Sequence, residues 1–164
     1  MVALAERHEP RTPLRVLIVE DSEDDAMLLV RELKRGGYEP DHERVETPEA
    51  LEKALAGSGW DVIVSDYHMP RFMAPEALRI SQRSGSKAPF IIVSGEVGED
   101  VAVQAMKAGA HDYVMKDNLT RLCATVGRAL EEAGERRERR RAEKESSGDA
   151  RLSSRPWGSR RSVS

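Results

Sequence analysis

The sequence predicts a doubly wound α/β domain in which helices cover both faces of a five-stranded parallel sheet. Short apolar runs alternate with amphipathic stretches from residue 14 onward. Runs such as VLIV and FIIV have no polar residue at alternate positions, so both faces of these strands should be buried. Five strand–helix units in series indicate a parallel sheet, and the last helix is expected to extend beyond the domain.

Each strand is expected where an apolar run stands between polar or turn-forming residues. The expected strands cover residues 14–19, 42–45, 61–65, 89–94 and 112–115. The helices are expected at about 24–35, from Thr47 to Gly57, after Pro75, at about 98–108 and from near Asn118. Thr47 followed by Pro48 is typical of a helix start, and glycines at 36, 57 and 109 are typical of helix ends.

Length and composition indicate a globular protein. A chain of 164 residues is long enough for one compact domain with an appendage. No apolar run approaches the roughly 18–20 residues that cross a membrane, and the charged N-terminus lacks the apolar core of a signal peptide. The single cysteine, Cys123, excludes an internal disulfide framework. We expect a cytoplasmic protein that does not associate with membranes.

Charge is distributed unevenly along the chain. Residues 1–130 contain 16 Lys and Arg against 22 Asp and Glu, a net charge of −6, whereas residues 131–164 contain 10 against 7, a net charge of +3. The part expected to fold is therefore acidic, and we expect no nucleic-acid surface there.

Polar residues stand at the carboxyl ends of four expected strands, where sheets of this kind bind their ligands. They are Glu20, Asp21, Asp66, Ser94 and Lys116. Three neighbouring carboxylates repel one another unless a cation lies between them, and oxygen-only ligands favour Mg²⁺. A lysine beside them suits phosphate. The set predicts phosphoryl transfer to an aspartate.

Four strings, VLIVEDSEDD, IVSDYHMP, IIVSG and AGAHDYVMKD, resemble the receiver domain of two-component response regulators. The resemblance covers about residues 12–131 and implies a flavodoxin-like receiver fold. It implies that Asp66 is the phosphoacceptor, and that Ser94 and Lys116 contact the phosphoryl oxygens. It also implies a switch role for Tyr113. The implied Mg²⁺ ligands are Glu20, Asp21, Asp66 and the backbone carbonyl of His68.

The sequence departs from the family pattern at two positions. Asp117 follows Lys116 where the family usually has a proline, commonly joined by a cis bond. A cis Lys–Asp bond would cost ~2.5–4 kcal/mol, so a different geometry is expected. Ala74 replaces a glycine that is common after the Met-Pro turn, and we expect a different turn there.

The resemblance implies a phosphorylation-controlled interaction switch rather than an enzyme. A histidine kinase or phosphotransfer protein would phosphorylate Asp66. The resemblance leaves open a homodimer formed through the fourth helix, fifth strand and fifth helix. The sequence does not name the downstream target. A flavin binder would need Ser-, Thr- and Gly-rich phosphate loops where residues 20–25 are acidic, and a Mg²⁺-dependent phosphatase usually has an acid at the position of His68.

The expected organisation has four parts. They are an N-terminal arm (1–11), the receiver domain (12–131), a charged helical extension (132–145) and a disordered Ser/Arg-rich tail (146–164). In the extension, Arg137, Arg140 and Lys144 occupy the positions that would continue the apolar stripe, which predicts an exposed or partner-dependent helix. The extension resembles linkers that join an N-terminal receiver to a sensory or kinase module, and no output domain is expected after it.

Overall fold

The computed structural model describes residues 10–57, 59–95 and 98–153, with side-chain burial up to residue 147. Residues 1–9 of the predicted N-terminal arm and residues 154–164 of the predicted tail therefore lie outside the described residues. Within the described ranges, no helix combines the length and the apolar character that crossing a membrane requires.

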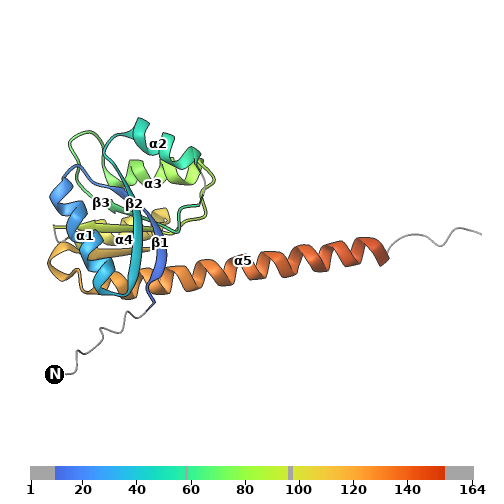
Figure 1. The fold of residues 1–164 in the computed structure, drawn as a ribbon. Helices are drawn as coiled ribbons and strands as arrows, with labels where there is room; N and C mark the ends of the chain where they lie inside the picture. The colour runs from blue at the N-terminus through green and yellow to red at the C-terminus, as the bar shows by residue number, and fades with distance from the viewer. Residues whose placement is uncertain (1–9, 58, 96–97, 154–164) are drawn as a thin grey trace, which may run out of the picture.

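Five parallel strands form one sheet in the order β2-β1-β3-β4-β5 (Figure 1). The strands are β1 (Thr12–Val19), β2 (Tyr38–Val45), β3 (Val62–Asp66), β4 (Phe90–Ser94) and β5 (Asp112–Met115). All four pairings between neighbouring strands are parallel. The predicted doubly wound sheet is confirmed, because the chain starts in the middle and adds strands first to one side and then to the other.

Five α-helices and one 3₁₀ turn connect and follow the strands. They are α1 (Glu23–Arg35), α2 (Pro48–Ala56), α3 (Ala74–Arg83), α4 (Glu99–Ala108), η1 (Lys116–Asn118) and α5 (Arg121–Ser153). The Thr47 side chain accepts a hydrogen bond of 3.1 Å from the Ala50 amide, as its predicted capping role requires. Gly109 ends α4 with φ 111°, a left-handed conformation that favours glycine.

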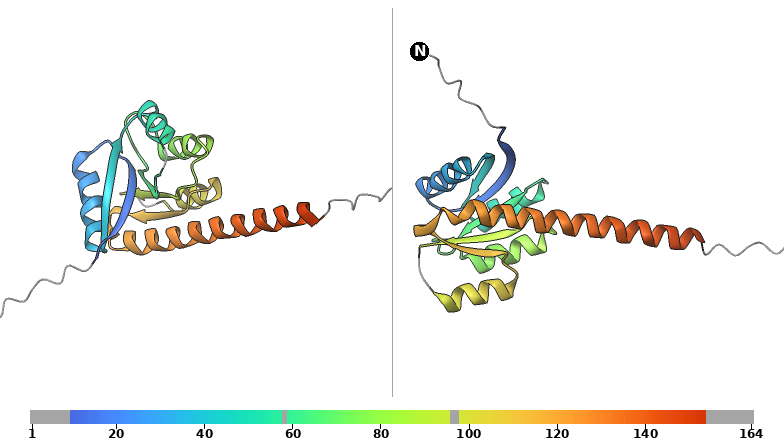
Figure 2. Two further views of the ribbon diagram at one scale, coloured as in Figure 1. Left: turned by 45° about the vertical axis from the view of Figure 1, so that its right-hand side comes forward. Right: turned by 90° about the horizontal axis from the view of Figure 1, so that it is seen from below.

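Helices pack on both faces of the sheet (Figure 2). One face packs with α1 and α5 and includes Val62 and Val64, whereas the other packs with α2, α3 and α4 and includes Ile63. Every residue of β3 and β4 is buried, which confirms that these strands have two covered faces.

The last helix differs from the prediction at both ends. It begins at Arg121 rather than near Asn118, because η1 and a hydrogen bond from the Leu122 amide to the Leu119 carbonyl precede it. It continues to Ser153, so residues 146–153 are helical where a disordered tail was expected. No proline interrupts the chain between Arg121 and Ser153. Beyond the sheet α5 projects from the domain as a single helix (Figure 1).

Candidate functional site

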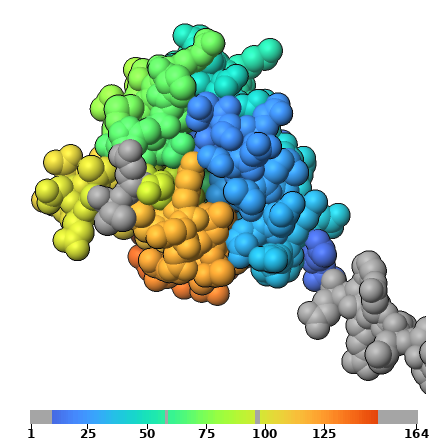
Figure 3. Space-filling model, turned by 90° about the vertical axis from the view of Figure 1, so that its left-hand side faces the viewer, coloured from blue at the N-terminus to red at the C-terminus, as the bar shows by residue number. Residues whose placement is uncertain are grey.

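The polar residues predicted at the strand ends gather at the carboxyl edge of the sheet. Figure 3 looks onto this edge, where the segment after β5, in orange, lies beside α1, in blue. Asp66 is the last residue of β3, and Glu20 directly follows β1. Since β1 and β3 are hydrogen-bonded neighbours, their ends lie side by side and bring the two acids together.

Three carboxylates form a compact cluster at this edge. One oxygen from each of Glu20, Asp21 and Asp66 lies within 4.8 Å of the others. Glu20 is 1% exposed and Asp66 is 9% exposed, whereas Asp21 lies at the surface. Two buried carboxylates and one exposed carboxylate could hold a hard cation between them while leaving it open to water on one side.

Lys116 supplies the positive charge beside the cluster. Its Nζ lies 2.9 Å from Asp25 Oδ2, 3.3 Å from Glu20 Oε2 and 3.4 Å from Asp66 Oδ2. The shortest contact is therefore with Asp25 in the first turn of α1, a residue that sequence reasoning did not single out. Its only signal was its place in the acidic run after β1, and nothing in that run distinguishes it from Glu23 or Asp24.

Local hydrogen bonds hold the two buried acids. Asp66 Oδ1 accepts 2.8 Å from the Tyr67 amide, and the Asp66 carbonyl accepts 2.8 Å from the Ser65 hydroxyl. Glu20 Oε1 accepts 3.2 Å from the Ser22 amide, while its carbonyl accepts 3.1 Å from Arg44 Nη1. Each acid therefore keeps one oxygen bound to a backbone amide and directs the other toward Lys116.

Crowding in the cluster shifts two pKa values. Burial, the charge of Asp66 and a hydrogen bond with Asp21 together raise the pKa of Glu20 to about 7. Burial alone would lower the pKa of Lys116. The hydrogen bond with Asp25 and the charges of Glu20 and Asp66 outweigh burial and raise that pKa above its ordinary value. The ammonium is therefore charged at neutral pH, whereas Glu20 is only partly ionised near pH 7, and a further cation would favour its carboxylate.

The other predicted site residues occupy the same edge or its margin. Ser94 is the buried last residue of β4 and is paired in register with Met115, directly before Lys116. Tyr113 is partly buried on β5, two residues before Met115 and on the same face of the strand. His68 is exposed in the β3–α3 loop, where its backbone forms an antiparallel bridge with Met73.

Both departures from the family pattern have a structural counterpart. None of the peptide bonds in the described ranges is cis, so the Lys116–Asp117 bond is trans, and it lies within η1. Ala74 is the buried first residue of α3, and its amide donates 3.0 Å to the Tyr67 carbonyl. The loop after Asp66 is therefore closed by a regular backbone hydrogen bond, and neither departure displaces Asp66 or Lys116 from the edge.

Comparison with known proteins agrees with this geometry. The family model described as response regulator receiver domain matches residues 16–127. The chain belongs to this family. It is 30% identical over 106 residues to the chemotaxis protein CheY1 of Helicobacter pylori (strain ATCC 700392 / 26695), an alignment that covers 63% of this chain and 85% of CheY1.

Solved structures of receiver domains have the same fold. The signal receiver domain of a putative LuxO repressor protein from Vibrio parahaemolyticus superposes with a TM-score of 0.65 at 28% identity, covering 74% of this chain and 93% of that one. The beryllofluoride-activated NtrC4 receiver domain dimer superposes with a TM-score of 0.64 at 30% identity, covering 73% and 98%. Residues 16–127 thus match a receiver domain, and α5 continues beyond them to Ser153.

Proposed function

We propose that this receiver domain accepts a phosphoryl group on Asp66 from a histidine kinase or phosphotransfer protein. The observation that carries the proposal is the meeting of Asp66 with two further carboxylates and the Lys116 ammonium at one sheet edge. In the transfer, a carboxylate oxygen of Asp66 attacks phosphorus as the phosphorus–nitrogen bond of phosphohistidine breaks, and the electron pair of that bond returns to the imidazole.

The surrounding side chains have distinct roles in this reaction. Lys116 lies 3.4 Å from Asp66 and would follow the negative charge from the carboxylate to the phosphoryl oxygens. The Ser94 hydroxyl would donate to a phosphoryl oxygen, and the Tyr67 amide keeps Asp66 oriented. Tyr113, on the strand that leads to Lys116, would change its packing when Ser94 moves toward the phosphate.

The donor set fits Mg²⁺, since all the available ligands are oxygens and the clustered carboxylates repel one another without a cation. Glu20, Asp21, Asp66 and the His68 carbonyl would hold the ion. When bound, Mg²⁺ supplies a positive charge that offsets the charge of the transferring phosphoryl group. Burial and the charge of Asp66 raise the pKa of Glu20, so a cation bound here would stabilise its ionised form.

The output surface would be the face formed by α4, β5 and α5. Val103 and Met106, two large apolar side chains on α4, are 52% and 45% exposed. Together with Tyr113 and Met115 they line a shallow cavity of about 670 Å³. A second copy of the domain would cover this face on phosphorylation, and the NtrC4 relative is an activated receiver dimer. The protein would act in the cytoplasm as a switch, with no turnover beyond its own phosphorylation and dephosphorylation.

Phosphorylation with a small donor tests the assignment of Asp66. Acetyl phosphate and Mg²⁺ should add one phosphoryl mass to the wild-type protein and to Asp41→Asn, a control at an exposed acid on β2, but not to Asp66→Asn. An adduct that persists in Asp66→Asn would refute the proposal.

Sizing in beryllofluoride tests the output surface separately. Wild type should change from monomer to dimer, and Met106→Glu should remain monomeric while still accepting the phosphoryl group. A dimer that survives Met106→Glu would exclude this face.

A further inference from the structure

A second concave site lies at the opposite end of the sheet from the acid cluster. A cavity of about 210 Å³ is lined by the end of α3, the segment leading into β4, the segment leading into β5 and the middle of α5. Its apolar floor includes Leu78 and Phe90, each 3% exposed, and Ala129, which is fully buried. The cavity is therefore a gap left where α5 leaves the body of the domain.

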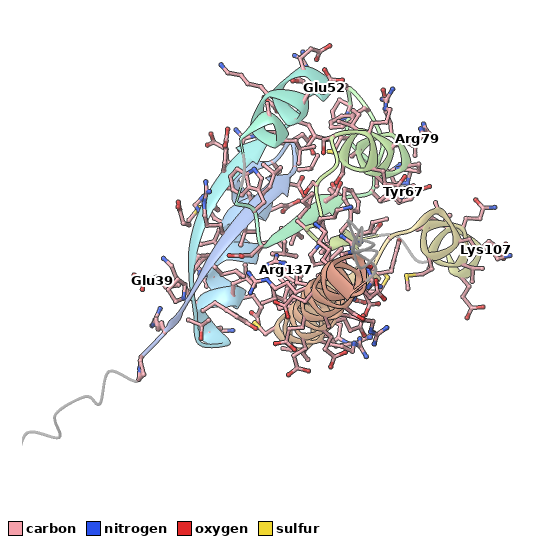
Figure 4. All side chains as sticks on the ribbon, turned by 90° about the vertical axis from the view of Figure 1, so that its right-hand side faces the viewer. Glu39, Glu52, Tyr67, Arg79, Lys107 and Arg137 are labelled. Carbon is pink, nitrogen blue, oxygen red and sulfur yellow. The ribbon has the colours of Figure 1, made fainter. Side chains whose placement is uncertain are left out.

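Four cationic side chains line this cavity. They are Lys87, Arg136, Arg137 and Arg140. Figure 4, which looks along α5, labels Arg137 on the side of the helix that faces the sheet. Lys87 comes from the segment before β4, so the cations approach the cavity from two separate elements.

These charges lack acidic partners in the described part of the chain. No ion pair joins any of the four cations to an acid of the described ranges. Along the helix, Arg137 has no acidic residue three or four positions away. Glu132, four positions before Arg136, has its Oε2 2.8 Å from His111 Nε2. Glu143 stands three positions after Arg140, but no ion pair of the described ranges joins them. The cavity is therefore lined by four cations that form no ion pair within the described part of the chain.

The size and charge of the cavity favour a particular class of ligand. Arginine forks match phosphate oxygens in pairs, and several converging cations favour an anion with more than one negative charge. At ~30 Å³ per water molecule, the cavity has room for roughly seven waters, a space close to that of a diphosphate group. The cavity volume is smaller than the ~300 Å³ of pockets that enclose whole drug-sized ligands. An attached organic group would lie outside the cavity.

We propose that this cavity binds a diphosphate group, either free or as part of a larger molecule such as a nucleoside diphosphate. The ligand would bridge Lys87 on the body to Arg137 and Arg140 on α5, and would fasten the base of the projecting helix to the domain. The site is separate from Asp66, and the inference does not depend on phosphorylation there.

Calorimetric titration of the full chain with inorganic pyrophosphate in Mg²⁺-free buffer tests this site. Saturable binding with one ligand per chain is expected. The double variant Arg137→Gln/Arg140→Gln and the single variant Lys87→Gln should each weaken binding by about ten-fold or more. The matched control Arg139→Gln/Arg141→Gln removes the same charge from residues of α5 that do not line the cavity, and should change affinity by less than about two-fold.

Parallel titrations identify the source of the diphosphate. Affinity for ADP equal to that for pyrophosphate would mean that the diphosphate group alone is recognised, and tighter ADP binding would mean that the organic part adds contacts. The proposal would be overturned in favour of a nonspecific basic helix by either of two results. One is that pyrophosphate binding weakens equally in Arg137→Gln/Arg140→Gln and in Arg139→Gln/Arg141→Gln, and the other is that duplex DNA binds these two variants equally. Absence of saturable binding at millimolar pyrophosphate would overturn it as well.

Discussion

The two ends of the parallel sheet carry opposite charges, and these charges differ in burial and in ion pairing. At the carboxyl edge, Lys116 contacts the carboxylates of Glu20, Asp25 and Asp66, of which Glu20 and Asp66 are buried. At the amino end, exposed cations such as Arg137 and Arg140 line the cavity without acidic partners in the described ranges. Charges at the first end are stabilised by one another, whereas those at the second are stabilised by solvent. Removing a charge should therefore change the stability of the fold strongly at the first end and weakly at the second.

The largest effect is expected from Lys116→Ala. Without the ammonium, Glu20 and Asp66 face each other uncompensated, so the metal-free protein should lose about 1–3 kcal/mol of unfolding free energy at pH 8. Phosphorylation by acetyl phosphate should fall by about ten-fold or more, because the charge that follows the phosphoryl group is gone. Urea denaturation and intact mass measure the two effects.

Magnesium affinity gives the same variant a sharper test. The site becomes more negative by one charge in Lys116→Ala, so calorimetry should show tighter Mg²⁺ binding although phosphorylation is weaker. The control Lys53→Ala, at an exposed position of α2, should change neither quantity. Unchanged or weaker Mg²⁺ binding in Lys116→Ala would contradict the view that the lysine and the ion share one acidic cluster.

The next largest effect concerns pH and Glu20. Its pKa is raised to about 7 by burial and by Asp66, so between pH 4.5 and 7 the folded state retains a proton that the unfolded state has released. Raising the pH through this window should therefore destabilise the metal-free protein, with a slope of at most about 1.4 kcal/mol per pH unit from this group.

Urea denaturation at several pH values isolates the contribution of Glu20. In EDTA, the difference between wild type and Glu20→Gln should vary with pH across this window. Saturating Mg²⁺ should reduce that variation, because the cation stabilises the ionised carboxylate. Parallel pH profiles for the two proteins in EDTA would show that Glu20 keeps an ordinary pKa.

A smaller effect is expected from Asp25→Asn. Asp25 makes the shortest contact with Lys116 but is partly exposed, and solvent screens the pair to ~0.6 kcal/mol. Releasing the ammonium toward Asp66 should increase the rate of phosphorylation by acetyl phosphate about three-fold. Asp24→Asn, an exposed neighbour in the same turn of α1, should leave the rate unchanged. Equal rates in all three proteins would remove Asp25 from the site.

Most of the sheet and of the acidic edge could be predicted because both depend on signals local in sequence. Apolar runs predicted the buried strands β3 and β4 to within a residue at each end. The rule that such sheets bind ligands at their carboxyl ends then selected Glu20 and Asp66 without any contact information. The first half of β2 was missed because β2 is an edge strand, and its mostly polar, exposed residues do not form an apolar run.

The features that could not be predicted depend on contacts between distant segments. Asp25 meets Lys116 across 91 positions of sequence, and the pairing follows only from how α1 and β5 end at the same edge. Arg137 and Arg140 were interpreted as the end of an apolar stripe. The approach of Lys87 to the same cavity became visible only in the folded chain.

The smallest effect on stability is expected from Arg137→Gln/Arg140→Gln, and it should be opposite in sign to that of Lys116→Ala. In Arg137→Gln/Arg140→Gln two like charges that lack acidic partners in the described ranges are removed, so their mutual repulsion disappears. In low salt and without ligand, the melting temperature should rise by no more than about 2 °C, and the rise should vanish near 0.5 M salt because solvent ions screen exposed charges. A fall in melting temperature that persists in high salt would mean that the arginines stabilise the domain through packing, and the contrast between its two ends would then be one of contacts rather than of charge.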